Sequence, residues 1–179
     1  MREIEIKARV QNKTKLEAAF RDLGIILSKP IKQHDRVFGE HGGVENALHS
    51  NWLRIRTEND KKHIFTLKRS VVGHLDSIEH ETEITDPSEL ENIIKEMHYE
   101  PYSDLIKIRR KGHYKDIEIC YDEVPSLGVF IEAEKLMHKD ADHNKVVAEL
   151  WVLLHKLGID KKDEEHEGYD VLERRQRGL

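Results

Sequence analysis

The chain opens with a strict alternation of charged and aliphatic residues. After Arg2, residues 3–10 read EIEIKARV, so every second side chain is apolar, and charged residues occupy the other positions. A repeat of two residues places successive side chains on opposite faces of a β-strand. The segment is therefore predicted to be a strand with one apolar and one charged face.

The rest of the chain divides into further strand and helix patterns. Strands are predicted over residues 25–39 with a break near Pro30, and over residues 52–57, 62–70, 78–85, 105–113, 117–124 and 129–136. Helices are predicted over residues 16–23, 146–157 and 169–177, and from an N-cap at Asp86 to near Met97. Residues 42–43 are typical of a loop, and residues 125–128 of a turn. These elements predict an α+β fold, an eight-stranded antiparallel closed β-barrel with helices packed on the outside.

The composition favours one globular domain over residues 1–179. With 37% hydrophobic residues, the chain can build a core that needs no disulfide, and its single cysteine suits a reducing compartment. No apolar run approaches the roughly 18 residues of a membrane span. A net charge of −5 disfavours nucleic-acid binding. We therefore expect a cytoplasmic protein with no membrane or nucleic-acid partner, and the sequence leaves open whether it forms a homodimer.

Charged residues occupy alternate positions in seven of the predicted strands. They are Glu3, Glu5, Lys7, Arg54, Arg56, Lys68, Glu79, Glu81, Glu83, Lys107, Arg109, Glu118, Asp122, Glu132 and Glu134. A solvated outer face would explain any one of these strands. Such a face usually mixes Thr, Ser and Gln with Lys, whereas this one is nearly all carboxylate, guanidinium and ammonium. If the sheet closes, these charges line a tunnel and must be paired or matched by a ligand.

Carboxylates and basic side chains in one tunnel suit a polyphosphate together with a divalent metal. Arg and Lys bind phosphate oxygens, and Arg often does so with two parallel hydrogen bonds. Carboxylates repel phosphate, but they bind Mg²⁺ or Mn²⁺, which can bridge to it. The sequence therefore predicts a metal-dependent site for a small-molecule triphosphate.

Several motifs resemble, in order, those of the CYTH family, also called triphosphate tunnel metalloenzymes. EIEIK at residues 3–7 is similar to its E-x-E-x-K opening, LRIR at 53–56 to its L-R-x-R strand, and TLK at 66–68 to its T-x-K strand. ETE at 81–83 resembles its E-x-E strand, KIR at 107–109 its K-x-R strand, and GYDVL at 168–172 its closing S-Y-x-x-L-L. Asp122 followed by LGVFIEAE at 127–134 resembles the most specific motif, D-x-V-x-x-L-G-x-F-x-E-x-E.

The resemblance implies Mg²⁺ or Mn²⁺ dependence and a role for each motif residue. Metal ligands would be Glu3, Glu5, Asp122, Glu132 and Glu134. Phosphate oxygens would be bound by Lys7, Arg54, Arg56, Lys68, Lys107 and Arg109. Lys7 and Asp122 would be catalytic, Asp122 as a metal ligand or base, and Glu81 and Glu83 would support the basic residues. Glu79 and Glu118 are expected nearer the barrel mouth, in structural roles.

The family contains several activities, and three remain open for this chain. The aliphatic spacer Ile6 and the compact length look more like the branch of class IV adenylyl cyclases and thiamine triphosphatases. A cyclase would convert ATP to cyclic AMP and pyrophosphate; a triphosphatase would hydrolyse thiamine triphosphate or inorganic tripolyphosphate. A non-catalytic triphosphate-binding module is the third reading. Its support is that Val37 and Gly39 replace the Tyr and Asp of the family's x-Y-F-D after Asp35.

The remaining candidate residues give little evidence of a further functional site. The twelve histidines form no H-x-H or H-x-x-x-H pair, so they predict no zinc site. Cys120 has no evident histidine partner that would make it a nucleophile. Trp52 is expected to anchor its strand, and residues 161–165 to form a solvated segment.

Overall fold

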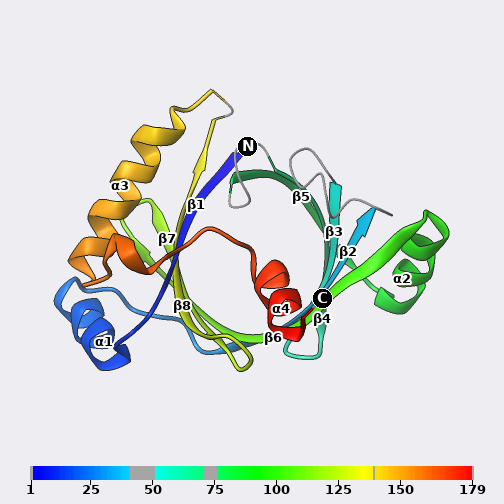
Figure 1. Cartoon of the computed structure of the whole chain (residues 1–179), viewed down its shortest axis with the longest axis horizontal. Helices are drawn as coiled ribbons and strands as arrows, with labels where there is room; N and C mark the ends of the chain where they lie inside the picture. Colours follow the sequence, from blue (N-terminus) through cyan, green and yellow to red (C-terminus); the bar gives the residue numbers. More distant parts are fainter. Residues whose placement is uncertain (1, 41–50, 71–75, 139, 179) are drawn as a thin grey trace. The chain divides into compact units, whose positions relative to one another are not determined.

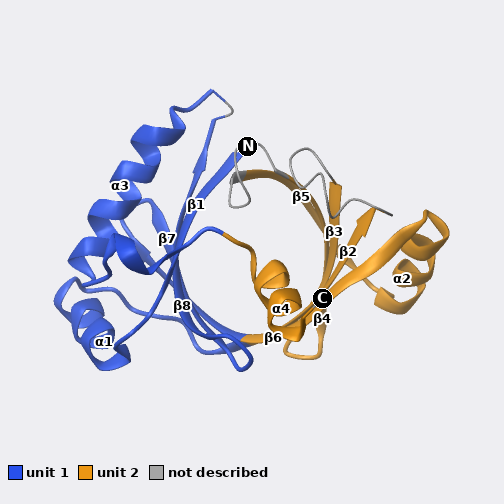
Figure 2. Ribbon diagram, in the orientation of Figure 1, with its two compact units in different colours: residues 1–31, 108–166 blue, residues 32–107, 167–179 orange. Residues whose placement is uncertain are grey.

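The structure is a computed structural model that describes residues 2–40, 51–70, 76–138 and 140–178. It divides into two compact units (Figure 2). Unit 1 comprises residues 1–31 and 108–166, and unit 2 comprises residues 32–107 and 167–179. The long strand β6 (Tyr99–Tyr114) contributes its second half to unit 1 and its first half to unit 2.

Unit 1 is an antiparallel sheet whose strands follow the order β6–β7–β8–β1–β9. Its strands besides β6 are β1 (Arg2–Arg9), β7 (Ile117–Val124), β8 (Gly128–Met137) and the two-residue β9 (Glu164–Glu165). Its helices are α1 (Lys13–Asp22), α3 (His143–Lys156) and the short 3₁₀ helix η2 (Lys161–Asp163). The register sets Ile6 opposite Ala133 and Ala133 opposite Ile119, so the apolar positions of three strands form one row.

That apolar face forms the core of unit 1. Helices α1 and α3 lie against it (Figure 1), and buried residues such as Leu16 and Leu150 pack with Ile6 in one hydrophobic cluster. Each helix has a side-chain N-cap: Asn12 accepts a hydrogen bond from the backbone of Lys15, and Asp142 caps α3 in the same way. The apolar half of each strand is thereby buried, and the charged half lies on the opposite face of the sheet.

Unit 2 holds the remaining strands of the same sheet, in the order β5–β4–β3–β2–β6. Its strands are β2 (Ile31–Glu40), β3 (Asn51–Glu58), β4 (Lys62–Ser70) and β5 (Asp76–Ile84), and its helices are α2 (Pro87–Glu96) and α4 (Tyr169–Arg177). A tight turn joins β3 and β4, with Asn59 and Asp60 both at positive φ. Phe38, Leu53 and Ile55 pack with Ile94 of α2 in the core of this unit.

Most predicted elements are confirmed, with small changes of boundary, and two differ more. The second strand begins only at Ile31, because residues 25–30 are not part of a strand ladder; there Ser28 exchanges hydrogen bonds with the backbone of Lys111. The strand predicted over residues 105–113 extends to residues 99–114.

The prediction of a solvated segment at residues 161–165 holds for Lys161 and Lys162, which are exposed, whereas residues 163–165 are half-buried. Glu164 and Glu165 form strand β9 on the edge of β1, and Glu165 forms an ion pair with Arg9. The loop predicted at residues 42–43 lies outside the described residues. Among the residues that the structure does describe, no helix is long and apolar enough to cross a membrane.

Candidate functional site

Unit 1 gathers carboxylates from three neighbouring strands on its charged face. The register sets Glu5 of β1 opposite Glu134 of β8, and Glu134 opposite Glu118 of β7. Carboxylate oxygens of Glu3, Glu5 and Glu134 all lie within 4.8 Å of one another. Three predicted metal ligands therefore lie close enough to share one cation.

The electrostatics of this carboxylate cluster suit a divalent cation. Burial, together with the nearby charges of Glu3 and Glu5, raises the pKa of Glu134 to about 9. Glu134 therefore holds a proton at neutral pH, and its carboxyl group hydrogen-bonds to Glu118. Oxygen-only ligands are the preferred donors of Mg²⁺ and Mn²⁺, and a cation would offset the repulsion among the carboxylates. The residues present thus fit the predicted metal.

The other predicted metal ligands of unit 1 lie in an ion-pair network beside this cluster. Arg109 donates to Asp122 through Nε at 2.7 Å, and its Nη2 contacts both Asp122 and Glu132. Lys7 Nζ lies 3.5 Å from Glu132 and 3.7 Å from Glu5. All of these side chains are nearly inaccessible to water, so the charges of the network are desolvated and need one another as partners.

Unit 2 holds most of the predicted phosphate-binding residues. Arg56 binds Asp35 with two hydrogen bonds of 2.7 Å, and Lys107 Nζ lies 4.0 Å from the same carboxylate. Burial opposes the charge of Asp35, but Arg56 and Lys107 outweigh it and hold the pKa of this carboxyl well below its usual range. Asp35 was not among the predicted site residues, although its alternation with Gln33 on one strand face was a signal for it.

The remaining basic residues of unit 2 share one carboxylate. Glu79 lies 2.9 Å from Lys68 and 3.5 Å from Arg54, and although burial opposes its charge, these two cations lower its pKa to about 2. Arg54 also donates to Glu81 at 3.0 Å. Glu79 is therefore the shared partner of two phosphate-binding candidates. Glu83 instead pairs with the exposed Lys62.

The two departures from the family motif lie on β2. Val37 faces Arg54 in the ladder, and nothing in the structure explains the valine. Gly39 faces Trp52, and a Cβ atom at Gly39 would lie 2.7 Å from the indole ring. A side chain at position 39 would therefore displace the tryptophan ring, which packs against Tyr102 with centroids 4.6 Å apart.

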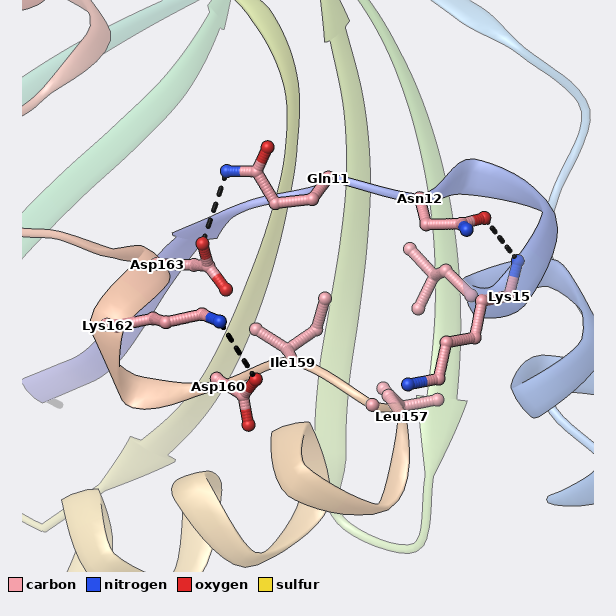
Figure 3. Close-up of a pocket in the computed structure, with 10 residues that line it drawn as sticks. Gln11, Asn12, Lys15, Leu157, Ile159, Asp160, Lys162 and Asp163 are labelled. Carbon is pink, nitrogen blue, oxygen red and sulfur yellow. Dashed lines mark hydrogen bonds and ion pairs between the residues drawn. The ribbon is translucent and has the colours of Figure 1, made fainter.

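A separate cavity of about 250 Å³ lies in unit 1, between the start of α1 and the end of α3 (Figure 3). Its lining includes Asn12, Lys15 and Ile159, and Gln11 donates to Asp163 at 3.2 Å across its edge. None of the predicted site residues lines it. The candidate site is thus the charged strand faces and not this cavity.

The fold and these strand motifs define a protein of the CYTH domain family. The sequence model of the CYTH domain matches residues 1–169, so the chain belongs to this family. A Methanocaldococcus jannaschii protein named "Putative adenylate cyclase MJ0240" is 30% identical over 165 residues, which cover 90% of this chain and 92% of that protein. CYTH proteins generally act on triphosphates and typically use a divalent metal.

Solved structures show the same fold. The PH1012 protein from Pyrococcus horikoshii OT3 is 22% identical, with a TM-score of 0.80 over 95% of this chain and 98% of that one. A Hippeastrum protein, described as "Putative adenylyl cyclase HpAC1" with "a dominant triphophatase activity", is 20% identical, with a TM-score of 0.64 over 98% and 96% of the two chains. The predicted fold class is confirmed: α+β, an eight-stranded antiparallel closed β-barrel with four helices.

Proposed function

We propose that this protein is a divalent-metal-dependent enzyme that acts on a nucleoside or organic triphosphate, in the manner of a class IV adenylyl cyclase. The observation that carries the proposal is the meeting of Glu3, Glu5 and Glu134 within 4.8 Å on a strand face of a CYTH protein. Such a cluster is electrostatically unfavourable by itself, because burial and the charges of Glu3 and Glu5 keep a proton on Glu134. A divalent cation would replace this proton and be bound by all three carboxylates.

In this proposal the two charged faces have different tasks. The carboxylates of unit 1 hold Mg²⁺ or Mn²⁺, with Glu3, Glu5 and Glu134 as the central ligands and Glu132 and Asp122 beside them. The triphosphate oxygens are bound by Lys7, Arg54, Arg56, Lys68, Lys107 and Arg109. Each arginine is oriented by a carboxylate: Asp35 takes two of the five N–H donors of Arg56 and so fixes the guanidinium plane.

The cyclase reaction breaks one bond and forms one at the α-phosphorus of ATP. The 3′-hydroxyl oxygen attacks this phosphorus, pyrophosphate leaves, and the hydroxyl proton passes to a base, for which we propose Asp122. Lys7, next to Glu132, would stabilise the negative charge that develops on the phosphate. A bound divalent cation would lower the pKa of the hydroxyl and neutralise the leaving pyrophosphate.

A triphosphatase is the second candidate. Its support is the Hippeastrum protein, which carries a cyclase name together with a dominant triphosphatase activity. In this reaction water attacks the terminal phosphorus and orthophosphate leaves, so the same side chains would serve with the substrate placed differently. Phosphoryl chemistry depends mostly on positioning and charge stabilisation, and the motif residues do not separate the two reactions.

One assay separates the candidates. The protein is incubated with ATP, thiamine triphosphate or tripolyphosphate and Mg²⁺ or Mn²⁺, and the products are resolved by chromatography. Cyclic AMP with pyrophosphate establishes the cyclase, and orthophosphate release establishes the triphosphatase. Glu134→Gln is the inactive control, and Glu123→Gln is the matched control, because Glu123 forms an exposed pair with Lys13. Absence of turnover with all three substrates would refute both enzyme proposals and favour a triphosphate-binding module.

A further inference from the structure

The C-terminal helix α4 contacts a phosphate-binding candidate of unit 2 directly. The ammonium group of Lys107 lies over the ring of Tyr169, the first residue of α4, at 4.6 Å from the centroid. On the next turn of the helix, the guanidinium of Arg174 lies 4.4 Å over the ring of Tyr102, and Arg174 Nη1 donates to the carbonyl of Tyr102 at 3.1 Å. Two cation–π contacts therefore join α4 to strand β6, and only one of them involves a predicted site residue.

The contact between Lys107 and Tyr169 is desolvated. The lysine is only 3% exposed, and Tyr169 is 7% exposed, so the ammonium group has lost most of its water. The ammonium group also lies 4.0 Å from Asp35, which Arg56 binds with two hydrogen bonds. A lysine ammonium is a point charge on a flexible stem, so its position depends on what surrounds it. A desolvated cation–π contact is stronger than an exposed one.

We propose that Tyr169 is a positioning residue for substrate binding, and that it acts through Lys107. The ring holds the ammonium group in place between α4 and Asp35, where it can bind a phosphate oxygen. The C-terminal helix would thus belong to the triphosphate-binding machinery. This inference rests on the proposed function, since it requires that Lys107 bind the triphosphate.

The helix has other anchors that permit a test of Tyr169 alone. Leu172 and Glu173 are buried on α4, and Arg174 donates a hydrogen bond to the carbonyl of Tyr102. Removal of the Tyr169 ring therefore leaves several contacts of α4 in place. Arg174→Met is a matched control, because it breaks the other cation–π contact without touching Lys107.

The experiment measures the Kd of tripolyphosphate by titration calorimetry, and kcat and KM for the substrate found in the product assay. Tyr169→Leu is expected to weaken tripolyphosphate binding about tenfold, the scale of a desolvated cation–π contact. Tyr169→Phe, which keeps the ring, should restore binding to within about twofold. Pentafluorophenylalanine at position 169 keeps the shape of the ring and reverses its quadrupole, so it should also weaken tripolyphosphate binding about tenfold. It tests the cation–π contact even if Tyr169→Leu folds poorly.

A double-mutant cycle shows whether Tyr169 acts through Lys107. In a Lys107→Met background, Tyr169→Leu should have no further effect on the Kd. Additive losses, or an equal loss in Arg174→Met, would overturn the inference, because they would mean that Tyr169 only docks the helix. A loss in Lys107→Met with none in Tyr169→Leu would overturn the inference and leave the proposed function standing. Unchanged binding in Lys107→Met would overturn the phosphate role of this lysine, and the inference with it.

Discussion

Asp35 is the counter-ion of two buried cations, and its replacement should destabilise the fold. In Asp35→Asn the carboxylate charge is lost, while Arg56 and Lys107 remain buried around it. Removal of one partner of a buried ion pair costs about 3–5 kcal/mol. We expect the lower end, about 3 kcal/mol, because the asparagine oxygen still accepts a hydrogen bond from Arg56. For a chain of this length that loss corresponds to a Tm lower by roughly 6–12 °C.

Urea unfolding followed by circular dichroism measures this loss. The matched control is Glu83→Gln: Glu83 pairs with Lys62, but both side chains are exposed, so the change should be under about 1 kcal/mol. Arg56→Met together with Asp35→Asn should recover part of the stability, since no guanidinium is then left without its partner. If Asp35→Asn costs no more than Glu83→Gln, the reasoning about the buried pair is refuted.

The pH dependence of the same variant has a definite sign. The folded-state pKa of Asp35 is depressed, so its stabilising contribution is present above the unfolded pKa, about 3.9 for Asp, and is lost as the pH falls below it. The difference in stability between the wild type and Asp35→Asn should therefore be full at neutral pH. It should shrink as the pH falls below about 4.

Three further predictions concern the site. Glu134→Gln and Lys68→Ala should each leave the circular dichroism spectrum unchanged and reduce turnover at least about a hundredfold. That is the scale expected for loss of a major electrostatic contact in the transition state. Near-normal turnover in both variants would contradict the site assignment. The pKa of Glu134 is raised to about 9 from an ordinary value of 4.5, so without a divalent cation the stability of the wild type should fall as the pH rises between these values. In urea titrations at pH 6–9, Glu134→Gln should make this fall less steep. An unchanged pH dependence of stability in this variant would count against the raised pKa. Gly39→Ala should displace the Trp52 ring and change the tryptophan fluorescence, and an unaltered spectrum would show that the close approach at 2.7 Å does not constrain the ring.

Local patterns predicted most of the elements because their causes are local. The alternation in residues 2–10 predicted β1, and the helix start at Asp86 is confirmed, since its carboxylate accepts hydrogen bonds from the backbone of Ser88 and Glu89. Strand β9 could not be predicted in this way. Two residues have no periodicity, and the strand forms only because Glu164 and Glu165 reach the edge of β1 from far along the chain.

The composition of the site was predictable, but its pairing was not. The i, i+2 spacing predicted which side chains share a strand face. Which carboxylate neutralises which cation depends on the register between strands that are distant in sequence. Arg109 meets Asp122 and Glu132 because β6, β7 and β8 are aligned, and Asp35 meets Arg56 because β2 and β3 are aligned. A sequence motif identifies the residues of such a network, but the register between strands determines which of them pair.

The glycine at position 39 illustrates how a departure from a family motif can have a structural cause. An aspartate there would bring its Cβ within 2.7 Å of the Trp52 indole, so the tryptophan excludes the carboxylate. The same indole packs on Tyr102, which in turn lies under Arg174 of α4. In this chain, a polar position of β2 is thus replaced by an aromatic stack that supports the C-terminal helix. The loss of the aspartate is therefore explained by the packing of unit 2, and by itself it is no argument for a loss of catalysis.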